Sequence, residues 1–258
     1  MSAFLHRFGF LKIGSNRAFQ APAMTAVRQW NYQQWLDGQN CAVVILNQPL
    51  NVRQSEIISR LWRSARARVA VDGGSNCLLK ELPQLTPDLI TGDLDSVTND
   101  VLQEYENRGV EIIRTADQEH TDFTKCLQVL YRRHPGLEII LAFCAMGGRL
   151  DQMMANINTL YQSVDFTHAD VVIHTGTEVC WVLRKGTHRI MTPQGVRGGY
   201  CGVIAVGSPV RATSKGLKWN LNSTELAFRR LVSTSNSITS DEVEIEVTDD
   251  VLWTMTLS

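Results

Sequence analysis

Acidic residues follow four apolar segments of strand length, at the point where each segment would end. The four turns cover residues 72–76, 92–96, 117–122 and 147–152. If the preceding segments lie parallel in one sheet, all four turns emerge at the edge where open α/β sheets bind ligands. Carboxylates gathered at such an edge commonly hold a hard divalent cation against phosphate oxygens. We therefore expect metal-assisted chemistry at phosphorus, without a P-loop, because the chain has no G-x-x-x-x-G-K-[ST] motif.

Asp93 and Asp95 give the strongest of these signals. In an extended segment, side chains two residues apart point to the same side, so both carboxylates could share one cation. The structural alternative is that Asp95 or Ser96 caps a helix beginning near residue 97. Capping does not explain Asp93, because a carboxylate at a buried strand end needs a partner.

The third group of polar residues runs from Asp117 to Lys125. Asp122 and Lys125 lie one helical turn apart, which suits a surface ion pair. The functional alternative is that Asp122 joins the metal cluster while Lys125 meets a phosphate. Gln118 and His120 are polar candidates for substrate contact, although a single histidine in a loop is more often simply solvated.

The other two turns contain paired glycines. Asp72-Gly73-Gly74 suits a tight turn, or a close approach of backbone N–H groups to a phosphate, and the motif alone favours the tight turn. Gly147-Gly148 precedes an expected helix and would form a small anion-binding N-terminus. Arg149 could clamp a phosphate there, with Asp151 orienting Arg149 or binding metal through water. An ordinary glycine-rich turn is the alternative.

Strand and helix patterns alternate six times ahead of residue 176. The expected strands are 41–46, 67–71, 88–91, 110–113, 138–144 and 170–174, and the expected helices are 54–66, 75–81, 97–108, one starting near 121, and 150–162. Short connections between them predict an α/β domain with a mainly parallel sheet covered by helices on both faces.

The pattern changes after residue 176. Short β-rich segments separated by glycines predict a smaller all-β domain, a sandwich or barrel, over residues 177–258. The α/β domain would then cover residues 37–176. Trp219 in the β-rich part is flanked by polar residues, so it could stack on a flat cationic or aromatic ligand. A half-buried structural tryptophan is the alternative that the residue alone favours.

Composition excludes several classes of partner. The formal net charge of −1 gives no indication of binding to nucleic acid or to an anionic membrane. The six cysteines have no C-x-x-C spacing, which is typical of reduced core thiols in an intracellular protein. No segment approaches the ~20 apolar residues that span a bilayer.

Residues 1–36 contain no acidic residue but several basic and apolar ones. This composition resembles a mitochondrial presequence, and the alternative is a disordered extension with Met24 as a second start. We expect a cytoplasmic protein, with mitochondrial targeting by the extension as the alternative.

Several strings of residues, taken in order, resemble the thiamine pyrophosphokinases of the eukaryotic type. They are Asp72–Asn76, Gly92–Ser96, Asp117–Lys125, Gly147–Gln152, Gly216–Leu221, Ser233–Asn236 and the closing Leu252–Met255. The resemblance extends from about residue 41 to the C-terminus. Departures are mild: Leu94 and Leu150 stand where we expect Phe, and Glu119 where we expect Asp.

This resemblance implies a homodimeric enzyme of two-domain subunits that transfers the pyrophosphate of ATP to the hydroxyethyl oxygen of thiamine, releasing AMP and requiring Mg²⁺. By similarity, Asp93, Asp95 and Asp122 would hold Mg²⁺ and the polyphosphate, and catalysis would rest on these three with Lys125 and Arg149. The ATP side would also include Asp72, Gly73, Gly74, Asn76, Asp151 and Gln152. Thiamine would contact Gln118, Ser235 and Asn236, and would stack on Trp219, which the partner subunit would supply.

Two other functions fit parts of the pattern. A nucleotide-sugar transferase could use Asp93-Leu94-Asp95 as its D-x-D pair, and a non-catalytic sensor could bind thiamine or nucleotide without turnover. The intact set of acids argues against a sensor. Because a loose transition state needs little base assistance, no general base is assigned, and Asp95 or Asp122 would be the first candidates.

Overall fold

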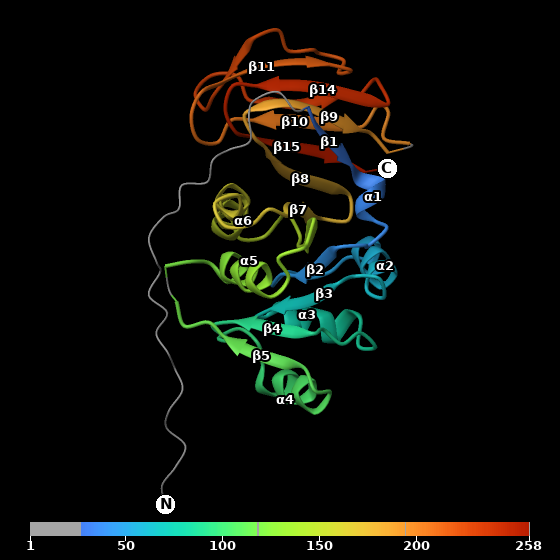
Figure 1. The fold of residues 1–258 in the computed structure, drawn as a ribbon, viewed down its shortest axis with the longest axis vertical. Helices are drawn as coiled ribbons and strands as arrows, with labels where there is room; N and C mark the ends of the chain where they lie inside the picture. The colour runs from blue at the N-terminus through green and yellow to red at the C-terminus, as the bar shows by residue number, and fades with distance from the viewer. Residues whose placement is uncertain (1–26, 118, 194, 258) are drawn as a thin grey trace, which may run out of the picture.

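The computed structural model describes residues 27–117, 119–193 and 195–257. Its main sheet has ten strands in the order β13-β10-β15-β8-β7-β6-β2-β3-β4-β5 (Figure 1). Six of them form a parallel block, as the sequence predicts: β2 Cys41–Ile45, β3 Ala67–Val71, β4 Leu89–Gly92, β5 Glu111–Arg114, β6 Ile139–Phe143 and β7 Asp170–His174. Every residue of β2 and β6 is buried, which explains why both strands are continuous apolar runs.

Helices cover both faces of the parallel block (Figure 1). The helices are α2 Val52–Leu61, α3 Gly74–Glu81, α4 Asn99–Asn107, α5 Asp122–Arg133 and α6 Leu150–Ser163. Side chains of α2, α3 and α4 share one buried cluster, and those of α5 and α6 share another. The helix between β5 and β6 therefore lies on the face opposite the first three, because a right-handed crossover back past β2 must use that face.

The C-terminal part is built from two layers of mainly antiparallel strands. One layer continues the main sheet with β8 Glu178–Leu183, β15 Val251–Thr256, β10 Tyr200–Ile204 and β13 Ser233–Ser237. The other is a five-stranded sheet of β1 Arg28–Asn31, β9 Gly186–Met191, β14 Glu242–Val247, β11 Val210–Lys215 and β12 Thr224–Leu226. Trp181 and Trp253 from the first layer share a buried cluster with Ile190 and Ile245 from the second. The predicted limit at residue 176 falls in the turn between β7 and β8, and the domain limits stay a prediction.

The prediction that residues 1–36 are an extension outside the fold is wrong for its last part. Residues 28–31 form β1, which pairs with β9 in parallel, and Tyr32–Trp35 form the short helix α1. Trp30 and Trp35 are buried and pack on Trp181, with ring centroids 5.4 and 5.1 Å away. Burial of these aromatic side chains therefore holds the segment in the fold, although its sequence shows neither helical nor strand periodicity. The rest of the predicted extension, residues 1–26, lies outside the described residues.

Across the described part of the chain, the structure has no helix that is both long enough and apolar enough to cross a membrane.

Candidate active site

Strand order decides which of the four turns are neighbours. β3, β4 and β5 lie side by side, so the turns that follow them meet at one edge of the sheet. The turn after β6 is separated from them by β2. The fourth predicted turn, residues 147–152, therefore lies on the other side of β2 from the first three.

Asp72, Asp93 and Asp122 form a group of carboxylates at this edge. One oxygen from each lies within 4.8 Å of the other two, with Asp72 buried and the others half-buried. We expected Asp72 beside ATP and Asp95 in the metal-binding set. Among the described residues, the structure instead groups Asp72 with Asp93 and Asp122.

The expected geometry of Asp93 and Asp95 is wrong because the segment between them is not extended. Leu94 has φ +63°, in the left-handed region. The turn folds back so that the backbone N–H of Asp95 donates to Asp93 Oδ1 over 3.3 Å, and the Asp95 side chain is exposed. The capping alternative fails as well, because α4 begins at Asn99 with Thr98 as its N-cap.

Hydrogen bonds join the three turns into one unit. Asp72 Oδ1 accepts from the backbone N–H groups of Ser96 and Val97, at 3.1 and 3.2 Å. Asp122 Oδ1 accepts from the Asp93 N–H at 3.1 Å. Asn76, predicted on the ATP side, donates to Ser96 O and holds the same loop. The carboxylates are therefore positioned by the backbone and do not depend on a ligand for their arrangement.

The electrostatics of the group favour a cation. Burial raises the pKa of the Asp93 carboxyl, and the neighbouring Asp122 carboxylate raises it further. Two anionic groups in partial burial repel one another, and a bound cation relieves that repulsion. The donor set of three carboxylates, with Asp72 and Asp122 each keeping a second oxygen free of hydrogen bonds from described residues, fits a hard divalent ion.

Lys125 is buried beneath this group and already has three acceptors. Its ammonium lies 2.7 Å from Asp122 Oδ1 and donates to the carbonyls of Asp117 and Thr115, at 2.9 and 3.3 Å. An ammonium has three protons, so all of them have acceptors in the protein. A direct contact with phosphate would need one of these bonds to be given up.

Of the two glycines of the β3 turn, Gly74 is required by packing, because it lies against backbone, whereas Gly73 lies against the end of a flexible side chain. A Cβ on Gly73 would lie 2.5 Å from the Asn47 amide, and one on Gly74 would lie 2.3 Å from the Ile45 carbonyl oxygen. The positive φ belongs instead to Asp72, at +45°. Unusual backbone at Asp72 and Leu94 therefore coincides with the acidic cluster, as strained residues at functional sites often do.

The turn after β6 has a different character. Arg149 and Asp151 form an ion pair with each other, and their side chains are 70% and 64% exposed. Gln152 is also exposed, and Gly148 has φ +78°. In the described structure this turn therefore contributes no side chain to the carboxylate group.

The loop before α5 is closed by its own polar contacts. Asp117 Oδ2 lies 2.5 Å from His120 Nδ1, and Asp117 Oδ1 accepts from the N–H of Glu119 at 2.8 Å. These hydrogen bonds, that from Glu119 first, hold the pKa of Asp117 below its usual range. Gln118, predicted to contact thiamine, lies outside the described residues.

The remaining predicted thiamine contacts lie together in the C-terminal part. Asn236 is buried, and its amide bonds to both the backbone N–H and the carbonyl of Trp219, at 3.2 and 2.8 Å. Trp219 is 57% exposed, with Lys218 Nζ 4.6 Å from its ring centroid. The Asn236 side chain therefore holds the backbone of Trp219 while the indole ring stays exposed. Ser235, with φ +55°, lines a cavity of about 240 Å³ together with Glu178 and Thr254.

A single chain keeps these two groups of residues apart. β13 and β4 are eight strand positions apart in the main sheet, which at the usual strand spacing is about 38 Å along the sheet. Ser235 and Trp219 therefore cannot face Asp93 of the same chain across one small substrate.

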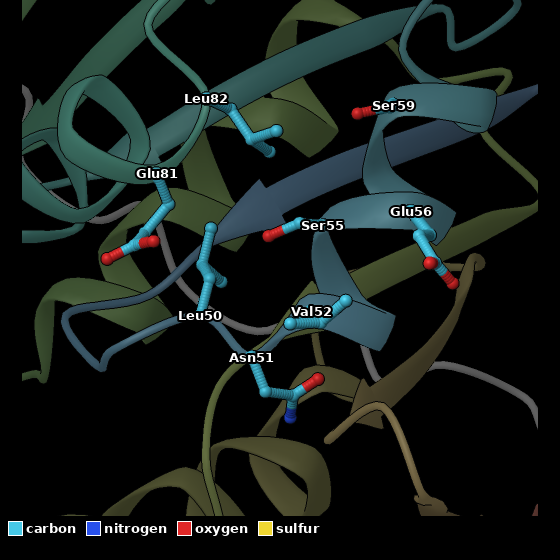
Figure 2. Close-up of a pocket in the computed structure, with 8 residues that line it drawn as sticks. All are labelled: Leu50, Asn51, Val52, Ser55, Glu56, Ser59, Glu81 and Leu82. Carbon is cyan, nitrogen blue, oxygen red and sulfur yellow. The ribbon is translucent and has the colours of Figure 1, made fainter.

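A second cavity, of about 640 Å³, lies between α2 and α3, and none of the clustered aspartates lines it. Figure 2 shows the Glu56 and Glu81 carboxylates on opposite sides of this groove, with Ser55 between them. Because both charges are negative, the groove does not suit a polyphosphate.

One contributor to the edge was missed from the sequence. The loop 46–51 follows β2 and lies against the β3 turn, where the Asn47 amide covers Gly73. A polar pair directly after the first apolar strand was the available signal.

Comparisons with known proteins agree on one family. Residues 58–173 match the family model "Thiamin pyrophosphokinase, catalytic domain", and residues 187–252 match "Thiamin pyrophosphokinase, vitamin B1 binding domain". Thiamine pyrophosphokinase 1 of Oryza sativa subsp. japonica is 36% identical, covering 84% of this chain and 87% of the relative. Thiamine pyrophosphokinase 1 of Arabidopsis thaliana is also 36% identical, covering 85% and 87%. The solved thiamin pyrophosphokinase from Candida albicans has a TM-score of 0.79 at 25% identity, covering 93% and 95%.

Proposed function

The chain belongs to the thiamine pyrophosphokinase family, and we propose that Asp72, Asp93 and Asp122 hold the divalent cation of its reaction. It is an enzyme that makes thiamine diphosphate and AMP from thiamine and ATP. The thiamine hydroxyl oxygen bonds to the β-phosphorus of ATP, the bond from that phosphorus to the α-phosphate oxygen breaks, and the hydroxyl proton is released. The observation that supports the metal assignment is the group of three carboxylates within 4.8 Å.

Mg²⁺ is the cation we assign to this group. Mg²⁺ takes oxygen ligands in octahedral geometry and usually shares them between a few carboxylates, substrate phosphates and water. When bound, it would neutralise charge on the polyphosphate and orient the β-phosphorus. The pKa of Asp93 is raised by burial and then by the neighbouring Asp122 carboxylate, and a bound cation would offset the repulsion between these two carboxylates.

The remaining polar residues of the edge position this group. Lys125 fixes Asp122 through an ion pair and the Thr115 and Asp117 carbonyls through two hydrogen bonds. Asp95 is exposed, and its Oδ1 accepts only from the Ser96 hydroxyl among described residues. It is therefore freer than Asp122 to take the thiamine proton late in the reaction. Arg149 would reach phosphate only after leaving Asp151.

We assign the thiamine contacts to the partner subunit of a homodimer. The distance of about 38 Å along the sheet supports a site in which Ser235 and Trp219 serve the carboxylates of another copy. Exposed apolar side chains occur near both regions: Met146, Leu150 and Met154 near the β6 turn, and Trp219, Phe228 and Leu231 in the C-terminal part. Packing one group against the other would form two equivalent sites.

A direct assay tests the reaction and its metal dependence. The purified chain is incubated with thiamine, ATP and Mg²⁺, and with EDTA as control, and products are separated by chromatography. We expect thiamine diphosphate and AMP in equal amounts, and none with EDTA. ADP with thiamine monophosphate would mean attack at the γ-phosphorus and would contradict the proposal. The nucleotide-sugar and sensor alternatives receive no support from the family comparisons.

A complementation experiment tests the shared site. Asp93→Asn and Trp219→Ala are each expected to inactivate a homodimer, because each damages both of its sites. About half of the dimers formed by random co-expression would be mixed, and each mixed dimer would contain one intact site of its two. About one quarter of wild-type activity should therefore return. No recovery in verified mixed dimers would show that each chain supplies its own site.

We also propose a cytoplasmic location, and the alternative is mitochondrial targeting by the N-terminal extension, residues 1–36. The alternative is supported by the composition of this segment, which has basic residues and no acidic ones. A fluorescent reporter fused to residues 1–36 would stay diffuse if the segment carries no address, and that result would exclude the mitochondrial alternative.

A further inference from the structure

The loop that carries Trp219 joins β11 to β12 and is bonded to β13. The backbone N–H of Lys218 donates to Ser237 O at 2.8 Å, and the Asn236 amide bonds to both backbone groups of Trp219. The backbone of Lys218 and Trp219 is therefore fixed by β13. Both side chains are exposed, so they can move while the backbone stays in place.

The cation of Lys218 lies on the ring of Trp219. Its Nζ is 4.6 Å from the ring centroid, a distance at which the ring quadrupole attracts a positive charge. Lys218 forms no ion pair with any residue that the structure describes, whereas Lys215 on the same segment pairs with Glu244. Within the described part of the chain, the indole ring is therefore the group that holds the Lys218 ammonium.

Thiamine, placed on Trp219 in the proposed function, needs the position that this ammonium holds. Its thiazolium ring carries a permanent positive charge, which favours stacking on an aromatic face for the same reason. A second cation on either face of the ring is repelled by the first. Thiamine therefore binds fully only after the Lys218 side chain has moved off the ring.

The diphosphate is the group that a displaced Lys218 would meet. In thiamine diphosphate it is attached to the hydroxyethyl arm of the thiazolium ring, so its negative charge lies close to the ring that stacks. Two cations of the α/β part are already engaged, Lys125 with Asp122 and Arg149 with Asp151. A lysine that reaches the phosphate oxygens stabilises the charge that develops during transfer, and Lys218 is an exposed lysine beside the thiamine position.

On the basis of the proposed function, we propose that Lys218 is a further catalytic residue, which covers Trp219 in the free enzyme and pairs with the diphosphate once thiamine has displaced it. Because Lys218 and Trp219 share one loop, both would act at the carboxylates of the other copy. Lys218 then has opposite effects on two ligands: it weakens the binding of thiamine and strengthens the binding of thiamine diphosphate. A lysine that only stabilised the loop would affect both ligands alike.

Calorimetry of the full chain with Mg²⁺ measures both effects without turnover. Lys218→Ala should bind thiamine about two- to five-fold more tightly, the effect of removing a competing cation–π contact at an exposed site. Its preference for thiamine diphosphate over thiamine, taken as the ratio of the two dissociation constants, should fall about ten-fold or more, since a hydrogen bond between charged groups is lost. The ratio isolates the phosphate contact, because uncovering the ring favours both ligands equally.

Two further variants check that the charge of Lys218 is responsible. Lys218→Arg keeps the positive charge and stacks well on an indole, so thiamine affinity should not rise and the ratio should stay near the wild-type value. Lys215→Ala, at a side chain that is 79% exposed, is the matched control and should change neither dissociation constant. In steady-state assays, Lys218→Ala should lower KM for thiamine and also lower kcat, the latter about ten-fold or more.

An unchanged thiamine affinity in Lys218→Ala, or an unchanged ratio, would overturn the inference. Trp219→Ala separates this failure from a failure of the proposed function, because it should abolish thiamine binding. If it does so while Lys218→Ala behaves as wild type, only the Lys218 inference fails. If Trp219→Ala binds thiamine normally, the proposed thiamine position fails, and this inference with it. If the wild-type chain makes no thiamine diphosphate, the proposed function fails, while a shifted ratio in Lys218→Ala would still support the contact between Lys218 and the diphosphate.

Discussion

The turns after β3, β4 and β5 and the turn after β6 have similar compositions but different structures. In the first group, carboxylates accept backbone N–H groups from neighbouring turns, and Asp72 is buried. In the second, Arg149 and Asp151 pair in solvent. The first group is organised without a ligand, whereas the second has few contacts that would resist rearrangement around one. Adjacency of strands therefore decides which acids form a preorganised site.

The largest expected effect is on turnover when the carboxylate group of Asp72, Asp93 and Asp122 is altered. Asp93→Asn removes one anion of the cluster, so kcat should fall about 10³-fold, as for other groups that stabilise transition-state charge. The free energy of unfolding should be unchanged or slightly higher, since like-charge repulsion is relieved. Rates of thiamine diphosphate formation and thermal unfolding check both. Asp151→Asn is the control from the β6 turn, and an equal loss of kcat there would erase the contrast.

The second effect is on stability beneath the same edge. Lys125→Met leaves Asp122 and two carbonyls without their shared donor, so unfolding should require about 3 to 5 kcal/mol less free energy, as when one partner of a buried ion pair is removed. Urea denaturation measures the difference. Lys80→Met, whose side chain is 80% exposed, should change stability little. If both variants behave alike, Lys125 does not organise the edge.

The third effect concerns the base of the β6 turn, which is buried although its tip is exposed. Gln54 Nε2 donates to Cys144 O and His174 O, and His174 contacts Tyr32 and the Gly176 N–H. Burial, and after it the charge of Arg53, lowers the pKa of His174 to about 4.

Because His174 in the unfolded chain would bind a proton near pH 6.5, this group favours folding above that pH. Its contribution should be lost as pH falls from 6.5 towards 4, by about 3 kcal/mol in total. Denaturation at several pH values measures the slope. In His174→Asn, which keeps an acceptor for the Gly176 N–H, the slope over this window should flatten, and an unaltered slope would assign the effect to other groups.

The smallest effect is expected at the exposed tip. Arg149→Gln removes a cation that is 70% exposed and bound only to Asp151 among described residues. We expect KM for ATP to rise less than about 10-fold, with no change in unfolding temperature. A loss as large as that of Asp93→Asn would mean that the turn rearranges fully onto the substrate.

Much of the α/β part could be predicted, because strands that are buried on both faces of the sheet consist of continuous apolar residues. β2 and β6 are uninterrupted apolar runs, and α5 shows helical spacing of Phe123, Leu127 and Leu130. The C-terminal strands were harder. β13 reads Ser-Thr-Ser-Asn-Ser and has no apolar alternation that would predict a strand, because its pairing with β10 is a property of the backbone and not of apolar side chains.

The position of the acidic group could be predicted, but not which carboxylates the structure brings together. The sequence places acids after β3, β4 and β5, but the choice between Asp72 and Asp95 depends on the left-handed backbone at Leu94. A leucine gives no local signal for that conformation, since it is unfavourable for leucine in isolation. The β1 segment was missed for a related reason: Trp30 is held by contacts with Trp181, 151 positions later in the chain.

The unbroken main sheet has a consequence for how such a protein can diverge. β8 continues the sheet from β7 through pairs such as Ile173 with Cys180, and the turn between them is packed so closely that a Cβ on Gly176 would meet the Asn51 amide at 2.6 Å. Recombination at this turn could not exchange the C-terminal part as a free module, because the replacement would have to bring a strand that fits β7. The acidic edge with Asp72, Asp93 and Asp122 and the surface around Trp219 are therefore expected to be inherited together, and new acceptor specificity is expected to arise by substitution within the shared sheet.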